Sequence, residues 1–318
     1  MGRNNRIQFA FIIITGLNLG LFSCKKDLEE PTTDVAHPAT SNSSKYISRI
    51  FDYVPAPGQF INTGLGNMEA TKSVIGQANQ GLISLGAFGG FITFGFDHSV
   101  ENIKGPDIGI FGNPLTAVGS EWSEPAIVMV MQDLNRNGLP DDGNWLELVG
   151  SEYTNGIKNY RITYYNPKNT RDDILWKDNQ GKQGYVLRNM FYGQQYYPLW
   201  AKNQEELTLT GTLLKSTLLD GDVITNKPFS WGYADNGSDD YKLMQQDKGT
   251  AYNVFDISNA VDATGQKVAL NYIDFVKVYT AQNSNGNPYE PDKNDARSRY
   301  LGEISAEFGG AIDLKLQQ

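Results

Sequence analysis

The chain has 318 residues, of which 40% are hydrophobic, and its formal net charge is −9. Its length and apolar content are sufficient for a buried core, while the acidic balance without a Lys/Arg cluster argues against a nucleic-acid partner. The single cysteine, Cys24, excludes a disulfide within the chain. The 33 glycines, 17 tyrosines and 15 phenylalanines favour strands and turns.

Residues 1–23 predict a lipoprotein signal peptide. Arg3 and Arg6 precede an apolar run, Phe9 to Phe22, that is short for a transmembrane helix. The run ends in LFSC at Cys24, which resembles a bacterial lipobox, whose cysteine is lipidated and becomes the first mature residue. We therefore expect a lipid-anchored outer-membrane protein exposed at the cell surface. An ordinary signal peptide or an internal apolar segment is the alternative.

Residues 24–45 predict a flexible tether behind the lipidated cysteine. The charged segment Lys25–Glu30 is followed by a stretch to Ser44 that is rich in Pro, Thr, Ser and Asn and has too few apolar residues to fold. The charged segment resembles the surface-export signal of Bacteroidetes lipoproteins. A plain solvated linker accounts for it equally well.

Residues 46–318 predict one all-β domain, because no second low-complexity linker or internal repeat interrupts them. Strands are expected at Leu82–Phe88 and Phe91–Asp97, with Gly89 and Gly90 as a hairpin turn between them. From Leu207 to Leu213, leucine and threonine occupy opposite faces, which is the pattern of a strand with one wet side.

The run Ala126–Met131 is apolar at every position, which predicts a central strand covered on both faces. Aromatic and β-branched residues mark the other expected strands, Trp145–Val149, Arg161–Tyr165, Phe229–Ala234, Val254–Ile257 and Ile273–Thr280. About ten strands separated by Gly, Asn and Pro predict a two-sheet β-sandwich with long loops, of which the jelly roll is one topology.

The loop after the central strand predicts a calcium site. Its expected ligands are oxygens of Asp133, Asn135, Asn137, Leu139, Asp141 and Asp142. The first half matches a helical calcium loop through Gly138, but Asn144 stands where that loop has glutamate, and strands flank it instead of helices. We expect a structural calcium ion bound more weakly than in that loop. A plain Asn/Asp/Gly turn is the alternative.

A second acidic segment follows the expected strand Phe229–Ala234. It contains Asp235, Asn236, Asp239 and Asp240, which could bind a second cation or polar ligand groups. An exposed hydrophilic turn is the alternative interpretation.

The segment Met190–Trp200 is the best candidate for contact with an organic ligand. The expected ligand-binding residues are Trp176, Tyr192, Tyr196, Tyr197 and Trp200. Such rings offer large, stiff surfaces for a sugar ring or the face of a corrin. An aromatic plug that closes one end of the sandwich is an equal alternative.

No catalytic motif is found. The two histidines are His37, in the expected tether, and His98, which is expected to be a structural hydrogen-bonding residue. A pair of carboxylates for glycoside hydrolysis stays open, because spatial pairing is invisible in a sequence.

Three segments resemble a group of Bacteroidetes surface lipoproteins described as "cell surface protein". They are Gly89–Asn113, Ser123–Tyr153 and Ile273–Ala281. The resemblance implies a setting beside a TonB-dependent outer-membrane transporter and a role in acquiring vitamin B12 (corrinoids). The hypothesis is therefore a surface lipoprotein that binds a corrinoid for uptake. A glycan-binding lipoprotein, a glycosidase-like hydrolase and an adhesin-like scaffold are the alternatives.

Overall fold

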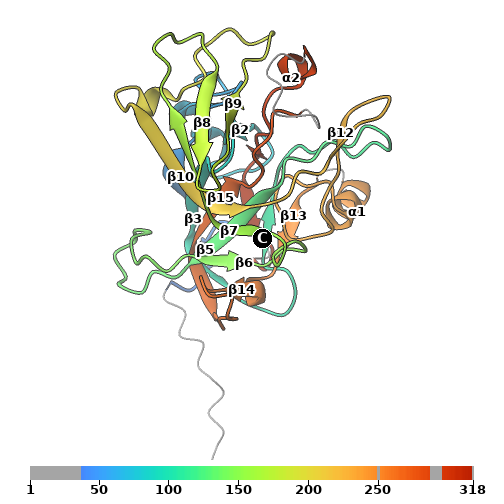
Figure 1. Cartoon of the computed structure of the whole chain (residues 1–318). Coiled ribbons are helices and arrows are strands. Elements are labelled where there is room, and N and C mark those ends of the chain that lie inside the picture. Colours follow the sequence, from blue (N-terminus) through green and yellow to red (C-terminus); the bar gives the residue numbers. More distant parts are fainter. Residues whose placement is uncertain (1–36, 249–250, 287–295, 317–318) are drawn as a thin grey trace, which may run out of the picture. The chain divides into compact units, whose positions relative to one another are not determined.

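The computed structural model describes residues 37–248, 251–286 and 296–316 (Figure 1). These residues form a mostly β structure in which all named strand pairings are antiparallel. The predicted all-β, sandwich-like class is confirmed. Cys24, the signal peptide and most of the tether lie outside the described residues. Within the described ranges, no helix has the length and apolar character needed to cross a membrane.

The largest sheet has six strands and contains the predicted central strand. Its order is β1 (Arg49–Val54), β3 (Phe91–Glu101), β15 (Tyr272–Thr280), β5 (Ala126–Met131), β6 (Leu146–Leu148) and β14 (Ala260–Val261). β5 is apolar throughout because its two faces enter different cores. Val128 and Val130 join the main core, whereas Ile127 packs with Tyr233 and Tyr279 on the opposite face.

The second sheet has four strands that are consecutive in the chain. Its order is β10 (Glu206–Leu213), β7 (Ile157–Tyr165), β8 (Ile174–Asp178) and β9 (Gln183–Val186). The predicted alternation in β10 holds through Thr210, since Leu207 and Leu209 are buried and Thr208 and Thr210 are exposed. It is wrong for Thr212, which is buried because the register shifts between Gly211 and Leu213. Its buried face packs into an aromatic core with Phe88, Tyr160 and Tyr164.

Smaller sheets complete the layers. They are β13 (Asn253–Phe255), β4 (Ile108–Ile110) and β17 (Ala311–Asp313); β16 (Glu307–Phe308) with β2 (Ile83–Ser84); and β11 (Leu218–Leu219) with β12 (Thr225–Asn226). The helices are η1 (Met68–Val74), η2 (Leu199–Ala201), α1 (Asp239–Lys248), η3 (Ile257–Asn259) and α2 (Ala296–Leu301). The main core lies between the six-stranded sheet and the sheets that contain β4 and β16.

The predicted hairpin at Gly89 and Gly90 is wrong. β2 pairs with β16, and β3 pairs with β1 and β15. The glycines serve a close backbone approach instead, because a Cβ on Gly90 would lie 1.8 Å from the Leu85 carbonyl oxygen. Gly90 is therefore required where two chain segments approach closely, and not in a two-residue turn.

The predicted strand Phe229–Ala234 is also wrong, apart from an isolated bridge between Ala234 and Ala126. The Asn236 side chain accepts a hydrogen bond from the Phe229 N–H and donates one to its carbonyl. This amide replaces a strand partner, so the segment stays a loop.

The folded domain begins earlier than the predicted boundary at residue 46. His37 exchanges two hydrogen bonds with Ser99 in β3, and the Ser44 N–H donates to Asp97. Residues 37–45 therefore lie against the sheet and are not part of a free tether.

Candidate functional site

The aromatic segment divides into a buried half and an exposed half. Tyr196 and Tyr197 are fully buried in the core of the four-stranded sheet, so these two predicted ligand residues belong to the plug. Tyr192 and Trp200 are 36% and 45% exposed. The aromatic plug therefore accounts for Tyr196 and Tyr197, whereas Tyr192 and Trp200 are accessible and stay predicted ligand residues.

Trp200 lies over a cleft of about 350 Å³, which we call the Trp200 cleft. Its wall includes Tyr53 and Pro55, and the exposed side chains of Met68 and Leu199 lie at its edge. The indole N–H of Trp200 donates to the Pro55 carbonyl at 3.2 Å, which fixes the ring. The cleft is therefore an apolar recess with an aromatic wall, as ligand sites commonly are.

A second exposed group, the Phe191 patch, consists of Met190, Phe191 and Tyr192 from the same segment and Tyr300 from α2. The Phe191 and Tyr300 rings are 6.1 Å apart between centroids. The Tyr192 ring packs edge-on against Phe60 at 5.0 Å. Exposed apolar clusters of this kind mark interaction sites more often than scattered single residues do.

Two asparagines hold these segments in place. The Asn62 side chain donates to the carbonyls of Gln195 and Tyr197 and accepts from the Leu199 N–H. The Asn189 amide donates to the Tyr300 carbonyl. The segments that carry the apolar side chains are therefore fixed relative to one another.

The structure does not bring Trp176 into this group. Its ring lies in β8 against Gly184, and it lines a separate cavity of about 460 Å³ with Tyr160 and Asp178. Met68, Phe191 and Tyr300 were not among the predicted ligand residues, because their exposure depends on which way each loop turns.

The Asp133 loop brings the predicted calcium ligands together, but backbone and amide groups already use most of their oxygens. The buried Asp133 carboxylate accepts from the N–H groups of Asn137 and Gly138. The Asn135 and Asn137 amides donate to Asp141, and these hydrogen bonds lower the pKa of its carboxyl. The loop is thus closed by its own polar groups, as a plain Asn/Asp/Gly turn would be.

The remaining predicted ligands are used in the same way. Asp142 accepts from the Leu134 N–H, and the Leu139 carbonyl accepts from the Asp141 N–H.

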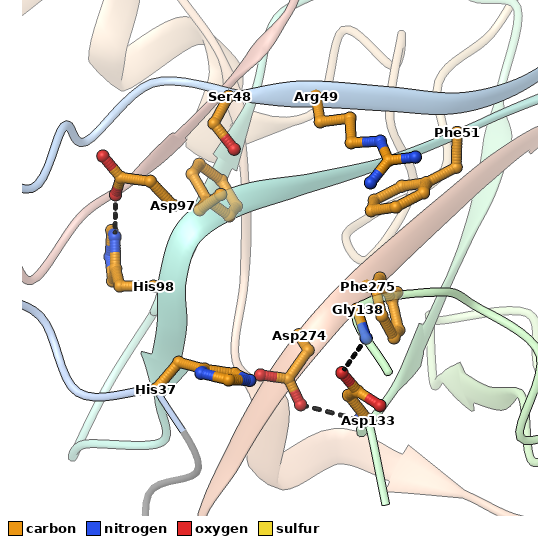
Figure 2. A pocket seen from close by; sticks show the side chains of 11 residues that line it. His37, Ser48, Arg49, Phe51, Asp97, His98, Asp133, Gly138, Asp274 and Phe275 are labelled. Atoms are coloured by element: carbon orange, nitrogen blue, oxygen red, sulfur yellow. Dashed lines mark hydrogen bonds and ion pairs between the residues drawn. The ribbon is translucent and has the colours of Figure 1, made fainter. Parts of the chain in front are cut away.

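A small cavity of about 180 Å³ lies beside this loop (Figure 2). At its wall, Asp274 accepts hydrogen bonds from the Asp133 N–H at 2.7 Å and the Ser99 hydroxyl at 2.5 Å. Nearby, the buried His98 ring contacts Asp97 at 2.7 Å and Asp313 at 2.9 Å. Burial opposes protonation of His98, but the two carboxylates outweigh it and raise its pKa. The predicted structural role of His98 is confirmed.

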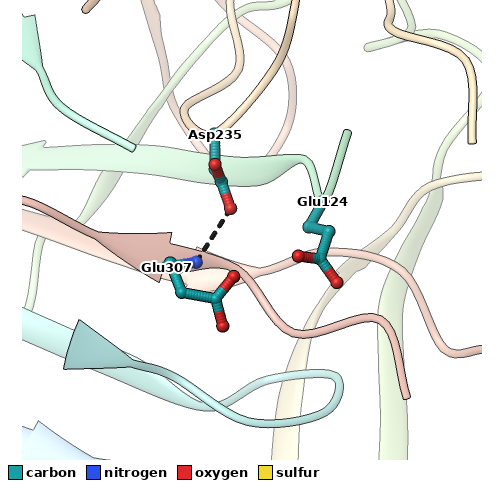
Figure 3. A group of neighbouring side chains, drawn as sticks. All are labelled: Glu124, Asp235 and Glu307. Carbon is teal, nitrogen blue, oxygen red and sulfur yellow. Dashed lines mark hydrogen bonds between the residues drawn. The ribbon is translucent and has the colours of Figure 1, made fainter. Parts of the chain in front are cut away.

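A further acidic group is mostly buried, and no lysine, arginine or histidine of the described residues forms an ion pair with it. Carboxylate oxygens of Glu124, Asp235 and Glu307 all lie within 4.8 Å of one another (Figure 3). Asp235 is 1% exposed and Asn236 is fully buried, so the alternative of an exposed hydrophilic turn is wrong for these two residues. We call this set, together with the neighbouring buried Glu303, the carboxylate cluster.

Backbone pairing brings the cluster together from distant parts of the chain. Glu124 lies just before β5, and its N–H donates to the Asp235 carbonyl. Asp235 in turn accepts from the N–H of Glu307, the first residue of β16, at 2.8 Å. Gly112 leaves room for the Asp235 carboxylate, because a Cβ there would lie 2.6 Å from Oδ1.

Burial raises the pKa of each acid in the carboxylate cluster. For Asp235, burial and then the charge of Glu124 raise the pKa well above its usual range. For Glu307, burial is the largest cause of the raised pKa, and the charges of Glu124 and Asp235 raise it further. Burial raises the pKa of Glu303 to about 8. Only Asp235 was singled out from the sequence, because its three partners lie in segments with no metal-ligand spacing.

No protein-family model matches the chain, and a search of curated proteins finds no similar sequence.

Proposed function

We propose that this protein is a lipid-anchored outer-membrane protein that binds an organic ligand at the Trp200 cleft and the Phe191 patch for a TonB-dependent transporter. The observation that carries the proposal is the half-exposed Trp200 ring, held over an apolar cleft by loops that Asn62 fixes. A rigid aromatic wall binds a flat or ring-shaped ligand with little loss of conformational entropy. The lipid anchor and the transporter rest on the sequence alone.

A corrinoid is the first choice of ligand, through resemblance to the Bacteroidetes lipoproteins. A cleft of about 350 Å³ is at the small end for ligand pockets. A corrinoid would therefore rest one face or side chain in the cleft and lie across the exposed aromatic residues.

A glycan is the second candidate, and the size of the cleft favours it. A single sugar ring fits the enclosed volume and could stack on Trp200. The hydrolase alternative is less well supported, because the described residues that line the Trp200 cleft include no aspartate or glutamate.

The test is calorimetric titration of the full chain with cyanocobalamin and, separately, with oligosaccharides. Trp200→Ala is expected to weaken binding at least tenfold while the circular dichroism spectrum stays unchanged. Trp231→Ala is the matched control, because Trp231 is equally exposed at 45% and lies outside the Trp200 cleft. Equal weakening by both variants, or no heat with either class at tens of micromolar protein, would refute the proposal.

We also propose a calcium ion at the Asp133 loop, with a structural role. Its support is the alternation of oxygen-bearing side chains in one loop with a left-handed Gly138 at the turn. Ion binding would require the Asn135 and Asn137 amides to turn their oxygens inward from their present partners. Asp141→Asn removes a carboxylate from the loop and should lower calcium affinity there.

A further inference from the structure

The oxygens of the carboxylate cluster have the spacing of ligands around one ion. Calcium binds oxygens at about 2.3–2.6 Å, so two of its ligands can lie up to about 5 Å apart. The separations among Glu124, Asp235 and Glu307 all fall within 4.8 Å. In Figure 3 the three carboxylates converge on a common space from separate segments of the chain.

An independent observation points to a missing partner at this place. Glu307 is only 5% exposed, and its Oε1 atom has no hydrogen-bond partner. The neighbouring Glu303 is 2% exposed, and its Oε2 is likewise unpartnered. Buried polar atoms nearly always have a partner, because leaving one without any costs free energy.

Four of the other oxygens accept hydrogen bonds from backbone N–H groups, and a side-chain hydrogen bond joins Glu124 and Glu307. Glu124 Oε1 accepts from Ser305 at 3.0 Å, and Glu303 Oε1 accepts from Gln59 at 2.7 Å. Asp235 accepts from Asn113 through Oδ1 and from Glu307 through Oδ2. Metal ligands are commonly oriented by outer hydrogen bonds of this kind.

We infer that Glu124, Asp235 and Glu307, with Glu303 beside them, bind a divalent cation that prefers oxygen ligands, for which calcium is the probe. The donor set is made only of carboxylates, which suits calcium, magnesium or manganese and not zinc or copper. Among the described residues no lysine, arginine or histidine forms an ion pair with these four acids. A divalent ion supplies the positive charge that the protein does not.

The competing explanation is a group of protonated acids that stabilises the fold without an ion. The two explanations differ in their response to calcium. An ion bound by the folded state alone stabilises it in proportion to the logarithm of its concentration. Protonated acids gain nothing from calcium.

The experiment compares the full chain with Glu307→Gln after EDTA treatment, by calorimetric titration with CaCl₂ and by thermal unfolding. The parent is expected to gain about 5 °C or more in Tm at a hundredfold excess over Kd. Glu307→Gln should bind one calcium ion fewer and lose most of this gain. Glu69→Gln is the control and should keep it, because Glu69 is exposed and belongs to neither proposed calcium site.

If Glu307→Gln does not fold, Glu124→Gln replaces it, because Glu124 is only partly buried and is also a proposed ligand. The inference is overturned if the parent gains no Tm from calcium, magnesium or manganese. It is equally overturned if the folded cluster variant keeps the parent's stoichiometry and gain. Neither result bears on ligand binding at the Trp200 cleft.

Discussion

The Asp133 loop and the carboxylate cluster are both acidic, but they use their oxygens in opposite ways. In the loop, the Asp133 carboxylate accepts hydrogen bonds from two backbone N–H groups. The Asp141 carboxylate accepts hydrogen bonds from two side-chain amides. In the cluster, buried oxygens of Glu303 and Glu307 have no partner. We therefore expect a cation where buried carboxylate oxygens have no partner, and not simply where acidic residues are most numerous.

The largest expected effect is a pH dependence that calcium abolishes. Burial raises the pKa of Glu303 to about 8, so its stabilising contribution is complete below the unfolded pKa near 4.5 and is lost as pH rises through 8. Metal-free protein should therefore lose about 4 kcal/mol of unfolding free energy between pH 5 and 8. Urea denaturation at both pH values, with EDTA or calcium, measures it.

Calcium should restore the stability at pH 8, because the ion takes the place of the protons. Glu303→Gln in EDTA is the control, and its stability should fall much less between the two pH values. An identical fall in parent and variant would assign the effect to other groups.

Asp133→Ala is expected to destabilise the protein by about 2–3 kcal/mol even in EDTA. The change leaves the N–H groups of Asn137 and Gly138 without their acceptor beside a buried strand end. This loss would show that the Asp133 carboxylate stabilises the folded state even when no ion is bound. If the variant were as stable as the parent in EDTA, the Asp133 carboxylate would contribute nothing to stability without calcium.

His98→Gln sharpens the comparison, because here the protein itself supplies the positive charge between two carboxylates. The loss is expected to be about 2 kcal/mol at pH 6, where His98 is protonated. Since the pKa of His98 is raised, this contribution is complete below the unfolded pKa of about 6.5 and fades as pH rises through the folded value. The difference between parent and variant in thermal unfolding should therefore shrink as the pH rises above 6.5, and a difference that grew with pH would contradict the ion pairs.

Asp141→Asn should have the smallest effect, below about 0.5 kcal/mol in EDTA, because its carboxylate is exposed and bonded only to flexible amides. Chemical denaturation measures the difference. A loss as large as that of Asp133→Ala would show that the two carboxylates act as one unit.

The hydrophobic pattern of the sequence predicted those strands whose burial follows from neighbouring residues in the chain. The unbroken apolar run of β5 and the alternation in β10 were sufficient to place both strands. The hairpin predicted at Gly89 and Gly90 was wrong, because a close approach between chain segments and a hairpin turn both require glycine. Nothing near Gly90 in the sequence specifies which segment it meets.

The candidate sites follow the same division. The Asp133 loop is contiguous, so its spacing could be recognised, whereas the carboxylate cluster exists only after β5, β16 and the Asp235 loop pair. Composition showed an aromatic segment, but the burial of Tyr196 and the exposure of Trp200 depend on loop contacts made by Asn62. Such long-range contacts leave no periodic signal.

The most direct test is the calcium content of the protein after dialysis against calcium-free buffer at pH 8, measured by elemental analysis. Glu307→Gln is expected to hold one calcium ion per chain fewer than the parent, and the control Glu69→Gln is expected to hold the same number as the parent. The same calcium content in parent and Glu307→Gln, or none in the parent, would contradict the assignment of the cation to the carboxylate cluster.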